Sequence, residues 1–251
     1  MNKAIIIDKT KCVHCGLCLK DCVAECLEFD KDKSPKYKED GKEHCFACQH
    51  CLAICPVGAL SFGNRTPDNS EPVSYGNSIE LLKLIKSRRS IREYKNENIP
   101  VETFNKIIEM LSFVPTGRNI ESLHFSLVET KEKMDEIRLI ADKYGFESNL
   151  IFRNATGMIA VSVNKTIAAQ SCESVDPIIA LSYADLYAQS LGLGTLWCGW
   201  AYDTVLKIQE IYSLLKISEE FTLAYIMLIG IPKLNYKRTI QPENFSISII
   251  K

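Results

Sequence analysis

The N-terminal part of this chain is organised around residues 12–22, which read Cys12-Val-His-Cys15-Gly-Leu-Cys18-Leu-Lys-Asp-Cys22. The same spacing returns at a constant offset in Cys45-Phe-Ala-Cys48-Gln-His-Cys51-Leu-Ala-Ile-Cys55, which is followed by proline. Thiolates spaced in this way on a tight loop can ligate three corners of a cubane cluster, and the fourth cysteine of each run can reach the other cluster. The two runs therefore predict a pair of 4Fe-4S centres.

The repeat continues past the ligand positions. Cys22-Val-Ala-Glu-Cys26-Leu-Glu-Phe29 matches Cys55-Pro-Val-Gly-Ala59-Leu-Ser-Phe62, which indicates an internal duplication. Over roughly residues 1–62 the chain resembles the bacterial two-cluster ferredoxins, although Val23 stands where that family usually has proline. The resemblance implies that Cys12, Cys15, Cys18 and Cys55 hold one cluster, and that Cys45, Cys48, Cys51 and Cys22 hold the other.

Two other uses of such cysteines have to be weighed. Paired C-x-x-C motifs build structural zinc sites, but a zinc site closes with four ligands and needs no third evenly spaced cysteine in both copies. A disulfide framework would suit a small secreted domain, and the sequence shows no secretory signal. Iron-sulfur clusters are therefore favoured. Cys26 stands where the second repeat has Ala59, so we interpret it as a small buried residue beside a cluster.

The composition predicts a cytoplasmic protein with reduced thiols. The chain has 251 residues, of which 46% are hydrophobic, and a formal net charge of −1. The apolar start at residues 4–7 is short and is followed at once by Asp8 and Lys9, unlike a signal sequence. No apolar stretch reaches the length of a bilayer span, and acidic and basic residues nearly balance. We therefore expect neither a membrane nor nucleic acid as a partner.

The domain boundary is predicted from turn-forming residues. Residues 63–77 are rich in glycine, proline, asparagine and serine and lack apolar periodicity, which is typical of a linker. We therefore expect a two-cluster domain at residues 1–62, a linker at 63–77 and a second domain at 78–251. About sixty residues cannot build a large core, so the first domain should depend on its clusters for stability.

An arginine-rich motif follows the linker. We expect Ser78 to cap a helix that carries Ile79, Leu82 and Ile85 on one side. This helix runs into Arg88-Arg89-Ser90-Ile91-Arg92-Glu-Tyr94, where three guanidiniums and a hydroxyl could bind an anion, since the arginine fork suits phosphate oxygens. The alternative is a solvated basic stretch, and the motif alone does not decide between the two.

Two further motifs decide between an anion site and a solvated basic stretch. They are Pro115-Thr116-Gly117-Arg118-Asn119 and residues 184–199, which read Ala-Asp-Leu-Tyr-Ala-Gln-Ser-Leu-Gly-Leu-Gly-Thr-Leu-Trp-Cys-Gly. In order and spacing the three motifs resemble the FMN-dependent nitroreductase family over roughly residues 78–241. The resemblance implies an α+β chain, in which a small ferredoxin-like iron-sulfur domain precedes a nitroreductase-type α/β sandwich with a central mixed sheet.

The resemblance also implies the residues that hold FMN. Arg88 and Ser90 match phosphate contacts within the motif that includes Arg89, Arg92 matches a contact to the ring or ribityl edge, and Arg238 matches a second phosphate arginine. Pro115, Thr116 and Asn119 match a loop that the partner subunit lays against the flavin. Leu196, Trp197, Cys198 and Gly199 match the segment that crosses the flavin ring, and the backbone amide of Cys198 is a candidate donor to flavin N5.

The remaining pattern is less specific. Aliphatic runs at residues 158–163 and 223–230 and the run from His124 to Val128 predict strands, and residues 104–113 and 176–191 predict helices. The second of these helices is apolar on most sides, and the family forms dimers through it, so we expect a homodimer with FMN at the subunit interface. No C-x-x-C motif joins Cys198 with Cys172, so we interpret Cys198 as a buried thiol.

These observations lead to one functional hypothesis. An external low-potential donor, a ferredoxin-type protein or reduced nicotinamide, would reduce the two clusters, and FMN would deliver two electrons to a small organic acceptor such as a nitroaromatic or quinone. The alternatives are a non-catalytic electron carrier or redox sensor, and a dedicated biosynthetic reductase or dehalogenase. The fold alone does not choose the acceptor. Exposed clusters are typical of an anaerobic host.

Overall fold

The structure is a computed structural model that describes residues 3–241 and 246–250. The chain divides into two compact units, Met1–Tyr75 with Arg118–Ile120, and Gly76–Gly117 with Glu121–Lys251. The predicted domain boundaries at residues 62 and 78 stay a prediction.

The first unit is built from short elements around the cysteine loops. Strand β1 (Ile5–Ile7) pairs antiparallel with β4 (Leu60–Phe62), and β2 (Leu27–Phe29) pairs antiparallel with β3 (Pro35–Tyr37). The helical segments are α1 (Leu17–Lys20), α2 (Gly41–His44), α3 (His50–Ala53) and η1 (Pro67–Asn69). The core is small: Ala47, Leu52, Leu60 and Phe62 are buried, with Ile5 and Ile7 packed against them. Such a core needs additional organisation, which bound clusters would provide.

The second unit contains one four-stranded sheet. Its strands are β5 (Leu123–Val128), β6 (Gly157–Val163), β7 (Gly194–Trp197) and β8 (Thr222–Gly230), in the order β5-β6-β8-β7. All pairs of these strands are antiparallel, and a parallel bridge joins Ser90 to Thr195 at the β7 edge. The helical elements are α4 (Ser78–Ser87), α5 (Val101–Leu111), η2 (Gly117–Asn119), α6 (Lys131–Lys143), α7 (Ser148–Phe152), α8 (Asp176–Ser190), α9 (Gly199–Lys207) and α10 (Gln209–Leu214).

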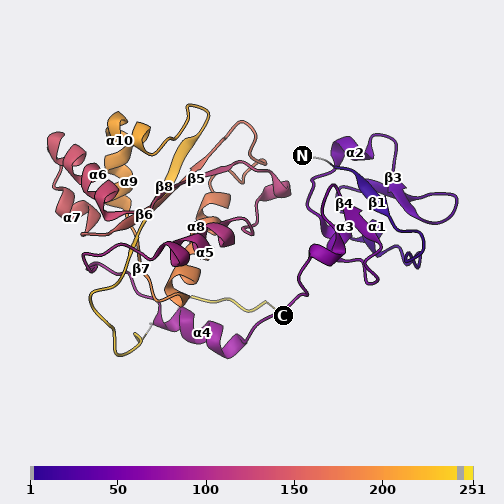
Figure 1. Ribbon diagram of the computed structural model, residues 1–251, viewed down its shortest axis with the longest axis horizontal. Helices are drawn as coiled ribbons and strands as arrows, with labels where there is room; N and C mark the ends of the chain where they lie inside the picture. The colour runs from indigo at the N-terminus through magenta and orange to yellow at the C-terminus, as the bar shows by residue number, and fades with distance from the viewer. Residues whose placement is uncertain (1–2, 242–245, 251) are drawn as a thin grey trace. The chain divides into compact units, whose positions relative to one another are not determined.

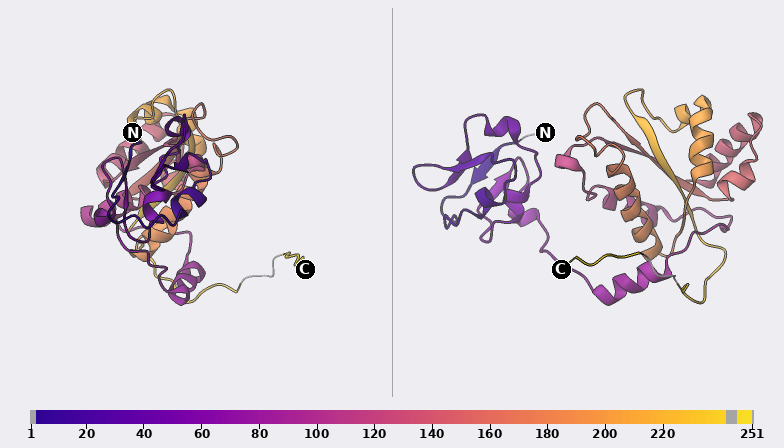
Figure 2. Two further views of the ribbon diagram at one scale, coloured as in Figure 1. Left: turned by 90° about the vertical axis from the view of Figure 1, so that its right-hand side faces the viewer. Right: turned by 180° about the vertical axis from the view of Figure 1, so that it is seen from behind.

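The sheet of the second unit is covered on both faces. Along β6, Met158 and Ala160 belong to one buried cluster and Ile159 and Val161 to another, because side chains of a strand alternate between faces. Helices α5 and α8 cover one face, and α6, α7, α9 and α10 cover the other (Figure 1, and from behind in Figure 2). This α/β sandwich confirms the predicted fold class.

The helix after the linker begins at Ser78, and its cap is Asn77. The Asn77 side chain accepts hydrogen bonds from the backbone nitrogens of Ile79, at 2.9 Å, and Glu80, at 3.4 Å. Asparagine is among the strongest N-cap residues, and Ser78 already lies in the first turn, where its hydroxyl is in the wrong position for that role. The prediction that Ser78 caps the helix was therefore wrong by one position.

Helix α8 matches the predicted apolar helix, ending at Ser190. It buries Ala180, Leu181, Ala184 and Ala188 against α5 and the sheet, and also buries two carboxylates, Asp176 and Asp185. Within the part of the chain that the structure describes, no helix combines the length and apolar character needed to cross a membrane.

Candidate functional site

The eight cysteines of the two runs line two separate cavities in the first unit. One cavity is lined by Cys12, Cys15, Cys18 and Cys55. The other is lined by Cys22, Cys45, Cys48 and Cys51. Each cavity thus receives three thiols from one run and the fourth from the other. Four thiolates around a cavity are the ligand set that a 4Fe-4S cubane requires, so these residues fit the cluster.

The internal duplication extends to the backbone that presents these thiols. Left-handed φ angles occur at matching positions of the two repeats: 55° at His14 and 56° at Ala47, and 72° at Gly16 and 61° at Gln49. These kinks turn each loop around its cavity before the short helices α1 and α3 begin. The backbone nitrogens of Cys26 and Ala59 also donate to the sulfurs of Cys22 and Cys55, at 3.4 and 3.2 Å.

Burial makes the thiol form of several of these cysteines favourable. It raises the pKa of Cys51 to about 12 and raises the pKa of Cys18 above its ordinary value. Because thiolates are the ligands, iron must stabilise the charged form when a cluster binds. Cys26 is 2% exposed and lines the second cavity beside Cys22, and burial raises its pKa to about 11. Its position agrees with the interpretation of a buried residue next to a cluster.

In the second unit the arginine motif lies against β7. Helix α4 ends at Ser87, and the next residue, Arg88, points one guanidinium nitrogen toward Asp185 of α8, with 3.7 Å between Nη1 and Oδ2. The backbone nitrogen of Ile91 donates to the carbonyl of Thr195 at 2.8 Å, beside the parallel bridge at Ser90. Backbone pairing therefore fixes the motif on the edge of the sheet, where two arginines, Arg88 and Arg89, line an open cavity of about 1080 Å³ together with residues 239–241.

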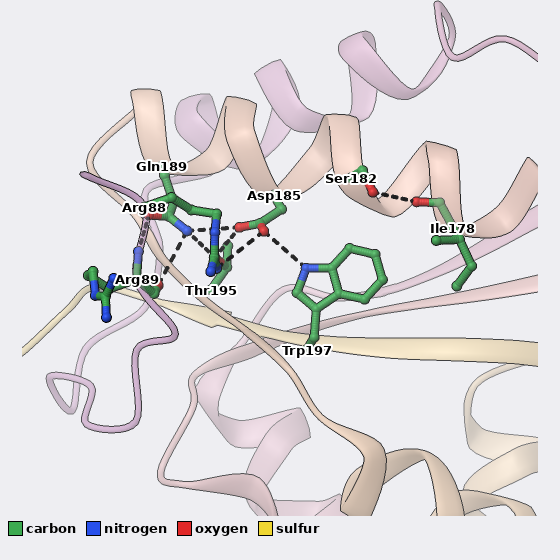
Figure 3. Close-up of polar contacts among 8 residues, drawn as sticks. All are labelled: Arg88, Arg89, Ile178, Ser182, Asp185, Gln189, Thr195 and Trp197. Atoms are coloured by element: carbon green, nitrogen blue, oxygen red, sulfur yellow. Dashed lines mark hydrogen bonds and ion pairs between the residues drawn. The ribbon is translucent and has the colours of Figure 1, made fainter. Parts of the chain in front are cut away.

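Asp185 is the centre of a buried polar network (Figure 3). Its Oδ1 accepts hydrogen bonds from the hydroxyl of Thr195 and from Nε2 of Gln189, the latter at 2.8 Å, and its Oδ2 accepts from Nε1 of Trp197 at 3.0 Å. Gln189 also accepts from the Arg89 backbone nitrogen at 3.3 Å. One carboxylate thus connects the arginine motif with the strand that leads to residues 196–199.

The segment from Leu196 to Gly199 packs through Trp197 against a pair of stacked tyrosines and leads into helix α9. The ring of Trp197 lies 5.6 Å from that of Tyr225, which in turn stacks on Tyr202 at 5.4 Å. The Cys198 thiol is buried, donates to the Ile151 carbonyl at 3.3 Å and caps α9 by accepting from the Ala201 nitrogen. Burial raises its pKa, which agrees with an inert thiol.

The proposed flavin donor at Cys198 needs a correction. The backbone nitrogen of Cys198 donates to the carbonyl of Ile226 at 3.1 Å, so strand pairing with β8 already uses it. The next amide, that of Gly199, lies in the first turn of α9, where helical N–H groups have no acceptor within the helix. The candidate donor of this segment therefore moves from Cys198 to Gly199.

The loop at residues 115–119 is held by another carboxylate of α8. The backbone nitrogen of Gly117 donates to Oδ2 of Asp176, a buried residue, at 2.9 Å. A Cβ atom at Gly117 would lie only 2.5 Å from the sulfur of Cys172, so the close approach requires glycine. Pro115 is exposed, Thr116 is half-buried, and Asn119 is exposed with a left-handed φ of 54°.

The predicted flavin contacts at Arg92 and Arg238 stay predictions. Both are exposed, and within residues 3–241 and 246–250 neither has an ion pair or a side-chain hydrogen bond. Conversely, the sequence did not point to Asp185, Gln189 and Thr195. The available signal was a pair of polar side chains four residues apart in an otherwise apolar helix, which places Asp185 and Gln189 on one face.

Comparisons with known proteins agree with both parts of the chain. The family described as "4Fe-4S dicluster domain" matches residues 11–59, and the family described as "Nitroreductase family" matches residues 85–143. An uncharacterized ferredoxin of Methanocaldococcus jannaschii is 38% identical over 60 residues, which cover 24% of this chain and 78% of that protein. The N-terminal resemblance is thereby confirmed.

The second resemblance is confirmed in the same way. A protein of Archaeoglobus fulgidus that carries the name NADH dehydrogenase/NAD(P)H nitroreductase is 27% identical over 161 residues, which cover 61% of this chain and 86% of that protein. A crystal structure of a nitroreductase with bound FMN from Desulfitobacterium hafniense superimposes with a TM-score of 0.57 at 27% identity, covering 68% of this chain and 98% of that one. The chain therefore carries a nitroreductase domain and, N-terminal to it, a ferredoxin domain of the 4Fe-4S dicluster type.

Proposed function

We propose that this protein takes electrons from an external low-potential donor into two 4Fe-4S clusters and passes them to FMN, which reduces a small organic acceptor by two electrons. The chain is an FMN-dependent, nitroreductase-like oxidoreductase with FMN and two 4Fe-4S clusters as its cofactors. The route of the electrons, the donor and the acceptor are the parts that this proposal adds.

The observation that carries the proposal is the grouping of the thiols. Eight cysteines gather as two sets of four around two cavities, in a chain that also has a nitroreductase domain. Clusters exchange single electrons, and FMN, when bound, converts single-electron transfers into delivery of an electron pair. A chain that carries both kinds of centre is suited to couple a one-electron donor to a two-electron acceptor.

The second unit offers the residues that would hold FMN. Arg88 and Arg89 place two guanidiniums at one cavity, which suits the phosphate, since arginine forms bidentate hydrogen bonds with phosphate oxygens. The first turn of α9 at Gly199 presents backbone donors, which stabilise negative charge on a neighbouring ring. Residues 88–91 and 194–199 are joined by a parallel bridge and by the Asp185 network, which supports assigning both groups to one site.

The proposed homodimer is supported by the surface of α4. Ile79, Leu82 and Ile85 are 63%, 50% and 49% exposed, and none of the ten residues of this helix is buried. An amphipathic helix with its whole apolar face in solvent is unfavourable, at about 25 cal/mol for each Å² of apolar surface. A second copy of the chain would cover this face. The family resemblance implies a dimer through residues 176–191, so α4 is an addition to that interface.

The experiment that tests the function is an anaerobic reductive titration of the iron-replete protein. Cluster EPR and flavin absorbance are followed together, and a nitroaromatic or quinone is added at the end. We expect clusters and flavin to be reduced and then reoxidised together by the acceptor. Reoxidation of flavin with clusters that stay reduced would exclude electron transfer between the two. Failure of all two-electron acceptors would indicate a carrier or sensor, and a single accepted compound would indicate a dedicated reductase or dehalogenase.

A further inference from the structure

The most unusual side chain of the nitroreductase unit is the buried carboxylate of Asp185. The residue is 5% exposed, and an ionised carboxylate is costly to bury unless several donors surround it. Its two oxygens accept three hydrogen bonds, from Thr195, Gln189 and Trp197. All three donors are neutral, so the carboxylate keeps its negative charge uncompensated by them.

Among the residues that the structure describes, the cation paired with this carboxylate is Arg88, and it is held at longer range. Its Nη1 lies 3.7 Å from Oδ2, beyond hydrogen-bond distance, and within the described residues its guanidinium has no other ion pair. The attraction therefore orients Arg88 without using its hydrogen-bond donors. The guanidinium donors that do not face Asp185 stay available for a phosphate group.

The same carboxylate fixes the strand on the other side of the site. Trp197 donates its indole nitrogen to Oδ2 at 3.0 Å, the oxygen that also faces Arg88. The Gln189 side chain forms hydrogen bonds with Asp185 and with the backbone of Arg89 (Figure 3). The carbonyl of Thr195 accepts a hydrogen bond from the backbone nitrogen of Ile91. A shift of the arginine motif relative to β7 would break several of these contacts at once.

From these contacts we propose that Asp185 is a positioning residue for FMN, a fixed buried anion that sets Arg88 and Trp197 in one register before the cofactor binds. The inference rests on the proposed function, since it assigns FMN to this site. In this role Asp185 contacts neither the phosphate nor the ring of FMN, and it acts through Arg88 and Trp197. Preorganisation of this kind lowers the ordering cost of binding and therefore raises affinity.

The decisive experiment is a double-mutant cycle on FMN affinity with Asp185→Asn and Arg88→Ala in the cluster-loaded full chain. The asparagine keeps the shape but loses the charge, and it turns an amide NH₂ or a single carbonyl toward donors that need a carboxylate. We expect Asp185→Asn to weaken FMN binding about tenfold in the wild-type background and by a smaller factor when Arg88 is absent, because only the effect through Trp197 then remains. Ser182→Ala, which removes only a bond within α8 to the Ile178 carbonyl at 2.8 Å, serves as the control.

Three affinity results would overturn the proposal: equal weakening in both backgrounds, no weakening, or tighter binding, which would mean that Asp185 competes with the phosphate. If Asp185→Asn does not fold, Trp197→Phe replaces it in the same cycle. Coupling between Trp197 and Arg88 supports the link through Asp185, and additive effects exclude it.

A second readout does not depend on FMN. The chain has two tryptophans, so Trp200→Phe assigns their indole N–H signals in a ¹⁵N NMR spectrum. We expect Asp185→Asn to shift the Trp197 signal while the Trp200 signal stays in place, and an unmoved Trp197 signal would overturn the proposal. If the wild type binds no FMN, the proposed function fails, and this spectrum still shows whether Asp185 holds the Trp197 side chain. If FMN binds and depends on Arg88 but not on Asp185, the inference alone fails.

Discussion

The backbone nitrogen of Cys198 lies 3.1 Å from the carbonyl oxygen of Ile226 and donates to it, so pairing between β7 and β8 extends to the last residue before α9. The amide at this position therefore belongs to the sheet, and the thiol of the same residue caps the helix. This places Cys198 in a structural role and leaves the first turn of α9, beginning at Gly199, as the part of the segment with available donors.

The thiol of Cys198 is expected to be dispensable for turnover. Cys198→Ser keeps a capping acceptor for the Ala201 nitrogen, so flavin content and reductase rate should stay within about twofold of the wild type. Cys198→Ala removes the cap and should cost about 0.5 to 2 kcal/mol of stability. Steady-state rates and thermal unfolding check both. A loss of turnover in a folded serine variant would show that the thiol takes part in the reaction.

The crossed cluster ligation predicts reciprocal effects of two substitutions. Cys22→Ala should abolish the cluster of Cys45, Cys48 and Cys51, and Cys55→Ala should abolish that of Cys12, Cys15 and Cys18, since each removes the fourth ligand of a cubane. Each variant should keep about half of the iron, which iron analysis and EPR of the anaerobic protein would measure. Cys26→Ala, at the wall of the same cavity as Cys22, should keep both clusters. Loss of the opposite cluster would refute the crossed arrangement.

Retention of FMN should depend on Arg88. Arg88→Ala removes charge-assisted contacts worth about 1.5 to 3 kcal/mol, which weakens FMN binding by about tenfold to a hundredfold. Arg88→Lys keeps the charge without the bidentate fork, so its FMN affinity should lie between those of the wild type and Arg88→Ala. Lys83→Ala on the same helix, a lysine paired with Glu80 in solvent, should leave affinity unchanged. Fluorescence titration of the flavin-free protein measures all four, and an unaltered Arg88→Ala variant would remove Arg88 from the site.

The exposed face of α4 predicts the oligomeric state. Leu82→Glu should shift the protein from dimer to monomer and lower FMN content, because a charge on a covered apolar face is strongly unfavourable. Leu139→Glu on α6, also at an exposed leucine of 70% exposure, should do neither. Analytical ultracentrifugation and flavin content measure the result. A wild-type monomer, or a dimeric Leu82→Glu variant, would show that α4 is not at the interface.

The ion pairs of Asp135 predict a pH-dependent stability term. Hydrogen bonding from Lys131 and the charge of the nearby Arg138 hold the pKa of Asp135 below its ordinary value of 3.8. A lowered folded pKa means that the stabilisation is complete above about pH 4 and is lost as the pH falls through the folded value. Asp135→Asn should therefore destabilise the protein by about 1 to 3 kcal/mol at pH 7, since the buried Arg138 loses its carboxylate.

The difference between wild type and Asp135→Asn should shrink below about pH 4, where the wild-type carboxyl becomes protonated. Urea unfolding at several pH values measures it. Glu136→Gln on the same helix removes an exposed pair with Lys133 and should change stability by less than about 1 kcal/mol. A difference that stays constant through the acidic range would exclude the ionised carboxylate as its source.

Much of the fold followed from the sequence, and so did most of the local elements. The strands at 158–163 and 223–230 and the helices at 104–113 and 176–191 were found because apolar periodicity reports burial directly. The helix cap was misplaced from Asn77 to Ser78 because both residues are good caps and only backbone geometry distinguishes them. The flavin contacts at Arg92 and Arg238 stay predictions. They rest on the family resemblance, which does not specify the position of an exposed side chain.

The sequence by itself determined the three closely spaced thiols of each run, because their spacing is a property of a short loop. The fourth thiol of each set was implied by the family resemblance, and it reaches its cavity through the tertiary fold. The tertiary structure alone decided the Asp185 network and the use of the Cys198 amide. Gln189 meets the backbone of Arg89 across 100 residues of chain, and the amide of Cys198 is taken by Ile226 through strand register. Hydrogen-bond partners of this kind are chosen by packing, which brings distant segments together, and no local pattern records that choice.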